Sequence, residues 1–143
     1  MPRVRKAVAL FDGFACSQAV LAAFCGRYGL DETMALRLAT GFAGGMKSGE
    51  VCGAASGAIM VIGLKYGHID AADKESRRFA GERVREFMDA FRERTGHLTC
   101  RDLLGCDIAT PEGRQYALNN NLFATTCRDL VVAAVEILES RGY

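Results

Sequence analysis

Cysteine is the residue type that gives this chain its candidate chemistry. Thiolates bind soft metal ions, hold iron–sulfur clusters and exchange electrons through disulfides. No two cysteines have the C-x-x-C spacing, so the sequence signals neither a zinc ribbon nor a thioredoxin-type pair. A shared site would therefore need sulfurs that converge from separate elements. The six cysteines are Cys16, Cys25, Cys52, Cys100, Cys106 and Cys127.

Five of these cysteines are candidates for such a site because of the elements on which they fall. Cys16 and Cys52 lie near the starts of predicted helices, where free N–H groups and the helix dipole favour a thiolate. Cys127 falls on the inward-facing stripe of the last predicted helix. Cys100 and Cys106 flank a one-turn segment and could bend towards one site. Taken singly, each could equally be a small buried apolar side chain.

The remaining residues that could do chemistry offer weaker signals. Cys25, in the middle of a predicted helix, is expected to fill the core. His68 and His97 each stand beside a glycine at a helix edge and are expected to be surface or capping residues. The run GGMKSG is not a Walker loop, because Met46 stands where that loop needs glycine. This run is expected either only to turn the chain tightly before Cys52 or also to line the Cys52 site with its N–H groups.

The elements that must position these residues are helices, because apolar residues recur at the helical period and strand-like alternation is nearly absent. Asp31 is expected to cap one helix, and Thr110 with Pro111 marks the start of another. The pattern predicts an all-α, compact single domain over residues 1–143, a bundle of about five to six helices. The helices are expected at residues 14–29, 31–38, from 50–52 to 66, 70 or 73 to 96, from 110, and at 121–140, with a short turn at 100–105.

Charge and hydropathy indicate which partners to expect. The net charge is +1 and both signs are interspersed, which gives no electrostatic footprint for nucleic acid. No run approaches the ~20 apolar residues of a membrane span, and the start of the chain lacks a secretory signal. We therefore expect no membrane insertion and a cytoplasmic location, where cysteines are thiols, metal ligands or redox groups. Glycines at positions 49, 53 and 57 form a small-residue stripe that would admit a neighbouring helix or the second copy of a homodimer.

Four cysteine segments together resemble a known family. The run GEVCGAASGAIMVIGLKYG, centred on CGAASG, resembles the CGAxxG signature of the C-GCAxxG-C-C family, whose members are regarded as small helical redox-active proteins of prokaryotes. The runs FACSQAVLAAF, TCRDLLGCDIATPEGR and CRDLVVAAVEIL are similar to the family's other cysteine segments, in the same order. Val51 departs from the pattern, because the family name has glycine at that position.

The resemblance implies which cysteines carry the function. The family's cysteines correspond to Cys16, Cys52, Cys127 and one of Cys100 or Cys106. Cys100 is favoured because it stands directly before the RDLLG segment, and Cys106 could replace it or join it as a ligand. Some relatives are fused to haem-binding segments, but this chain has no C-x-x-C-H run, so covalent haem is not expected. A redox partner protein is implied, without its identity.

Three functions from different classes fit these residues. In the first, Cys16, Cys52, Cys100 and Cys127 bind an iron–sulfur cluster for electron transfer or sensing. In the second, the chain is a thiol/disulfide oxidoreductase or a carrier of sulfur or selenium, with Cys52 and Cys100 or Cys127 as reacting thiols. In the third, it is a non-enzymatic helical module with a structural zinc site or with buried cysteines alone. The iron–sulfur cluster is the expected cofactor, and zinc or no cofactor are the alternatives.

Overall fold

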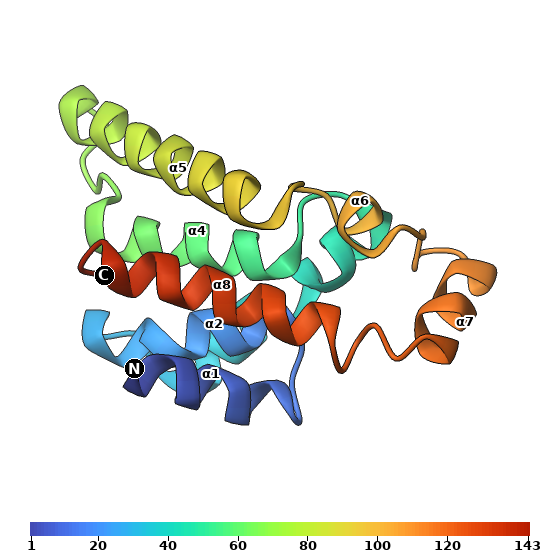
Figure 1. The fold of residues 1–143 in the computed structure, drawn as a ribbon. Coiled ribbons are helices and arrows are strands. Elements are labelled where there is room, and N and C mark those ends of the chain that lie inside the picture. Colours follow the sequence, from blue (N-terminus) through green and yellow to red (C-terminus); the bar gives the residue numbers. More distant parts are fainter.

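Eight α-helices and three short turns of other helix types make up the computed structural model, which describes all residues from 1 to 143 (Figure 1). The all-α fold class is confirmed, and the one strand-like pairing is an isolated antiparallel bridge between Val51 and Thr99. The α-helices are α1 Pro2–Phe11, α2 Cys16–Phe24, α3 Glu32–Ala39, α4 Gly53–Tyr66, α5 Lys74–Thr95, α6 Cys100–Leu104, α7 Pro111–Asn119 and α8 Thr126–Ser140. The 3-10 turns η1 Cys25–Tyr28 and η2 Thr40–Phe42 and the π turn η3 Gly45–Gly49 lie between them.

The expected number of helices, five to six, was wrong because α1 and α6 were not predicted. The apolar residues of α1, which are Val4, Ala7, Leu10 and Phe11, recur at helical spacing and pack on the core, so this helix could have been predicted from the sequence. α6 is five residues long, which is too short for a helical period to appear. The starts of two helices also differ from expectation. α4 begins at Gly53 with Cys52 as its N-cap, and α8 begins at Thr126, after a left-handed residue at Asn121 (φ 56°).

The helix ends that carry strong capping signals lie where the sequence places them. The Asp31 carboxylate accepts a hydrogen bond from the Met34 N–H (3.1 Å), which caps α3. The Thr110 hydroxyl accepts one from the Gly113 N–H (3.0 Å), with Pro111 at the first position of α7. These caps are local interactions between residues three apart, so they can be predicted without knowledge of the tertiary fold.

α2 lies at the centre of the bundle and packs against α1, α3, α4 and α8. Only small residues let α4 approach it closely. A β-carbon on Gly57 of α4 would lie 2.8 Å from the carbonyl oxygen of Ser17 in α2, which is closer than van der Waals contact allows. Of the small-residue stripe predicted from the sequence, Gly57 therefore serves a contact between two helices of the same chain, whereas Gly49 lies outside α4, in η3.

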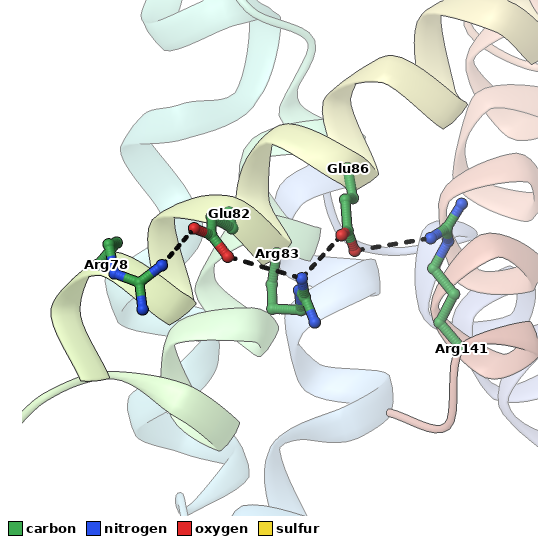
Figure 2. Close-up of polar contacts among 5 residues, drawn as sticks. All are labelled: Arg78, Glu82, Arg83, Glu86 and Arg141. Carbon is green, nitrogen blue, oxygen red and sulfur yellow. Dashed lines mark hydrogen bonds and ion pairs between the residues drawn. The ribbon is translucent and has the colours of Figure 1, made fainter. Parts of the chain in front are cut away.

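α5 is the longest helix and packs along α4 and α8. A row of alternating charges runs along it from Arg78 to Glu86 and ends at Arg141, which follows α8 (Figure 2). The pairs are exposed, so each contributes only about 0–1 kcal/mol to stability. They nevertheless join the end of α8 to α5. No helix of the structure, α5 included, is both long enough and apolar enough to span a bilayer.

α7 lies apart from the bundle. Figure 1 shows it beyond the end of the bundle at which α8 begins, on two connecting stretches that precede and follow it in the chain. Its Ala117 is buried, whereas Tyr116 and Leu118 are about half exposed (53% and 52%). Arg114 of α7 lines the cavity described next.

Candidate functional site

Four cysteines line one cavity of about 430 Å³ at the end of the bundle: Cys16, Cys52, Cys100 and Cys127. Each stands at the beginning of a helix. Cys16 is the first residue of α2, Cys52 is the N-cap of α4, Cys100 is the first residue of α6 and Cys127 is the second residue of α8. The sulfurs thus approach a common space from four separate elements.

Gly53 makes room for the sulfur of Cys16. A β-carbon at Gly53 would lie 2.5 Å from the Cys16 sulfur, so any larger residue would displace that sulfur. The backbone N–H groups of Gly44 and Ala54 face the same sulfur and favour its charged form. Gly53, the glycine of the CGA run, therefore leaves the space that the Cys16 sulfur occupies, and it is also the first residue of α4.

Cys52 and Cys100 are held by the bridge between their two segments. The Cys52 N–H donates to the Leu98 carbonyl (2.8 Å), and the Cys100 N–H donates to the Glu50 carbonyl (2.6 Å). The Arg101 guanidinium also pairs with the Glu50 carboxylate at 3.1 Å. Although 48 positions separate the two cysteines in the chain (100 − 52), the bridge fixes their backbones side by side at one wall of the cavity.

Cys127 reaches the cavity through the stretch that returns from α7. Its N–H donates to the Leu122 carbonyl (3.0 Å), which closes a turn immediately before α8. The sequence predicts that Cys127 faces the packed core. The structure instead places it half-buried at the cavity, where Phe123 and Leu130 stand beside it in the wall.

The other candidates lie outside the cavity wall. Cys106 is half-buried next to Asp107 and does not line the cavity, but it is close enough to raise the pKa of both Cys100 and Cys127. Cys25 is 1% exposed within the hydrophobic core, as expected for a filler residue. His68 and His97 are both exposed at the surface. All six cysteines are free thiols, without a disulfide among them.

Burial governs the protonation of the cavity thiols. It raises the pKa of Cys52 to about 12 and the pKa of Cys100 to about 11, and nearby cysteines add to both shifts. Burial also raises the pKa of Cys16 and that of Cys127 above the ordinary range. The N–H groups of Ala54 and Ala55 act in the opposite direction on Cys52, but they do not offset desolvation. The expectation that helix starts give thiolates here was therefore wrong for the metal-free protein.

Two cations that the sequence analysis did not single out also line the cavity, Lys47 and Arg114. Lys47 belongs to η3, in which Met46 and Lys47 both adopt left-handed conformations (φ 57° and 58°). Arg114 belongs to α7, and its guanidinium lies over the Phe123 ring, 5.7 Å from the centroid. Lys47 belongs to the GGMKSG run and Arg114 ends the TCRDLLGCDIATPEGR segment, but neither run indicates that the tertiary fold brings its cation to the cavity.

The glycine-rich run before Cys52 turns tightly, as the sequence predicts. Gly44, Gly45, Met46 and Lys47 are all left-handed, and the Glu50 N–H closes the turn on the Gly45 carbonyl at 3.1 Å. The run also contributes an N–H group to the site. That group belongs to Gly44 and faces Cys16, whereas the sequence placed it beside Cys52.

Comparison with known proteins gives one match. A family model described as "Putative redox-active protein (C_GCAxxG_C_C)" matches residues 14–141, a range that includes all six cysteines. No curated protein and no solved structure matches the chain.

Proposed function

Because the chain belongs to the C_GCAxxG_C_C family of redox-active proteins, we propose that Cys16, Cys52, Cys100 and Cys127 hold an iron–sulfur cluster for electron transfer or sensing. The observation that carries the proposal is the convergence of four sulfurs from four helix starts on one cavity. Four thiolates are the usual ligand set of such clusters, and the ligands need not be close in sequence.

The donor set supports a group of several atoms over a single ion. Cysteine sulfur is the only metal-binding side-chain atom in the wall, which has no histidine, aspartate or glutamate. As the side chains lie, no three His, Cys, Asp or Glu residues are gathered closely enough to hold one metal ion. A tetrahedral zinc site needs all its sulfurs about 2.3 Å from one point.

The protein's own groups would support the charge that the ligands acquire. Neutral thiols must lose protons when they bind metal, so loading would release protons to solvent. The Gly44 and Ala54 N–H groups at Cys16, and those of Ala54 and Ala55 at Cys52, are placed to stabilise negative charge on sulfur. When bound, the cluster would supply a one-electron couple, and the surrounding apolar side chains would limit water access.

Anaerobic reconstitution with iron and sulfide tests the proposal. We expect a coloured protein that contains iron and acid-labile sulfide in equal amounts. Single Cys→Ser substitutions at Cys16, Cys52, Cys100 and Cys127 should each reduce the cluster content. The matched control is Cys25→Ser in the core, which should retain it. Cys106→Ser shows whether Cys106 joins the ligands. A colourless protein without iron or labile sulfide after reconstitution would rule out the cluster.

A thiol/disulfide couple between Cys52 and Cys100 is the second candidate, and the backbone bridge between their segments favours it. Two thiols would give up two electrons and two protons to form the sulfur–sulfur bond. Since the bridge pairs Val51 with Thr99, the two cysteines are diagonal neighbours across it. Oxidation with oxidised glutathione, followed by mass spectrometry of the linked peptides, tests this couple.

A further inference from the structure

We propose that the four-cysteine cavity accepts a small anionic ligand, a carboxylate or an oxyanion, which Lys47 and Arg114 draw towards the sulfurs. The inference goes beyond the proposed function, because it concerns the metal-free protein and holds whether or not a cluster forms. It begins from the two cations in the cavity wall.

Neither cation has an anionic partner. Lys47 and Arg114 form no ion pair and no side-chain hydrogen bond, whereas the nearby Arg101 is paired with Glu50. Both side chains are exposed, so they stand where the cavity opens to solvent. Unpaired cations at the rim of a cavity are free to bind an incoming anion.

The wall itself carries no negative side chain, because aspartate and glutamate are absent from the residues that line the cavity. One carboxylate lies next to the wall: Asp107 accepts a hydrogen bond from the Ala109 N–H, and its charge acts on Cys100. The N-terminal ends of α2, α4 and α8 add positive partial charge. Phe11, Leu104 and Ile108 supply apolar walls, which concentrate the field inside the cavity. The summed field favours an anion over a neutral molecule of the same size.

The position of Lys47 has an energetic cost. Met46 and Lys47 hold left-handed conformations that non-glycine residues adopt only at a cost of about 1–2 kcal/mol each. Strain of this kind persists where the surrounding structure imposes it, and it gathers at functional positions. Here the strained turn places one of the two cations at the cavity opening.

Alkylation with two reagents of nearly equal size tests the proposal on the reduced, metal-free full chain. Iodoacetate is an anion and iodoacetamide is neutral, and with both a thiolate sulfur displaces iodide. The ratio of their rates at one cysteine is therefore independent of how much thiolate is present. We expect the ratio at Cys16 and Cys127, the half-buried cavity thiols, to exceed the ratio in the urea-unfolded chain by about tenfold.

Charge-neutral variants identify the source of that preference. Lys47→Gln and Arg114→Gln should each lower the ratio several-fold, and the double variant should bring it close to the unfolded value. Lys74→Gln and Arg77→Gln, which remove unpaired exposed cations of α5, are the matched controls and should leave it unchanged. Lys47→Arg should preserve the preference. Added salt should weaken it in the wild type, because screening reduces the attraction.

Two results would overturn the inference. One is a wild-type ratio equal to that of the unfolded chain, and the other is a ratio that the double variant leaves unchanged. A cavity whose thiols react with neither reagent would also overturn it, because small ligands could not then enter. Failure to bind iron would count against the cluster alone, since the alkylation ratio requires no metal.

Discussion

The sulfur of Cys16 occupies the space that a side chain at position 53 would need. The 2.5 Å between that sulfur and a β-carbon on Gly53 is far inside van der Waals contact. Gly57, one turn later on α4, is equally confined, but there the obstacle is the backbone of α2 at Ser17. The two glycines of the CGAxxG run thus have different partners, one in the site and one in the packing between helices.

The main effect of Gly53→Ala should be on the four-cysteine site. The added methyl group must push the Cys16 sulfur out of place, so reconstituted protein should contain less iron and sulfide than the wild type. Overpacking of this kind also costs about 1–3 kcal/mol of unfolding free energy. Urea unfolding and metal analysis of the same preparations measure both effects.

Gly63→Ala is the matched control, because a β-carbon there would meet nothing within 4 Å. Alanine is the better helix former, so this change should stabilise the protein by about 0.5–1 kcal/mol and leave cluster content unchanged. Equal cluster contents in the two variants would show that the space at Gly53 does not matter for the site.

Gly57→Ala should test the packing of α2 against α4 separately from the cysteine site. Its β-carbon would lie 2.8 Å from the Ser17 carbonyl oxygen, and backbone cannot rotate away as a side chain can. We expect α2 and α4 to move apart, with a loss of about 1–3 kcal/mol in the free energy of unfolding. Thermal and urea unfolding check this. If Gly57→Ala were as stable as Gly63→Ala, α2 and α4 would have space for a methyl group at position 57, which would contradict this prediction.

The sequence is sufficient to predict the features that depend on local patterns. The caps at Asp31 and Thr110 involve neighbours three residues away, and the helical period of most segments is visible without the fold. The family resemblance rests on cysteine segments whose order can be read directly from the chain. These features do not depend on how distant elements pack.

The remaining features of the site arise from tertiary placement. Lys47 and Arg114 both line the cavity because η3 turns left-handed and because α7 lies beyond the end of the bundle. The protonation of Cys52 likewise follows from burial by residues far away in sequence. A helix start can be recognised from the sequence, but the desolvation that outweighs its dipole cannot.

The stability of the metal-free protein should fall in alkali. Burial raises the folded-state pKa of Cys52 from 9.0 to about 12, so the unfolded chain loses this proton first as pH rises. The contribution is intact below about pH 9 and is lost between about pH 9 and pH 12, with a slope of about 1.4 kcal/mol per pH unit for one thiol. Urea unfolding at a series of pH values measures the slope.

Cys52→Ala should reduce that slope by the contribution of one thiol, because Cys16, Cys100 and Cys127, whose pKa values burial also raises, still titrate. Ser56→Ala, which removes a hydroxyl from the same helix that does not titrate in this range, should keep the wild-type slope. Thiolate absorbance in the ultraviolet gives an independent reading, and the folded protein should show no cavity thiolate at pH 8. A thiolate signal at that pH from Cys52 would contradict the burial argument.

Met46→Gly should stabilise the fold without weakening the anion preference. Glycine adopts the left-handed conformation of this turn freely, so the substitution removes a strain of about 1–2 kcal/mol. Met46 is 51% exposed, so little buried surface is lost with it, and the net gain should be about 1 kcal/mol. Lys47→Gly is the informative comparison, because it relieves the same strain but also removes the cation. Both variants should unfold at higher urea concentration than the wild type, and only Lys47→Gly should lower the iodoacetate-to-iodoacetamide ratio. If Met46→Gly lowers the ratio as much, the turn rather than the charge of Lys47 sets the preference.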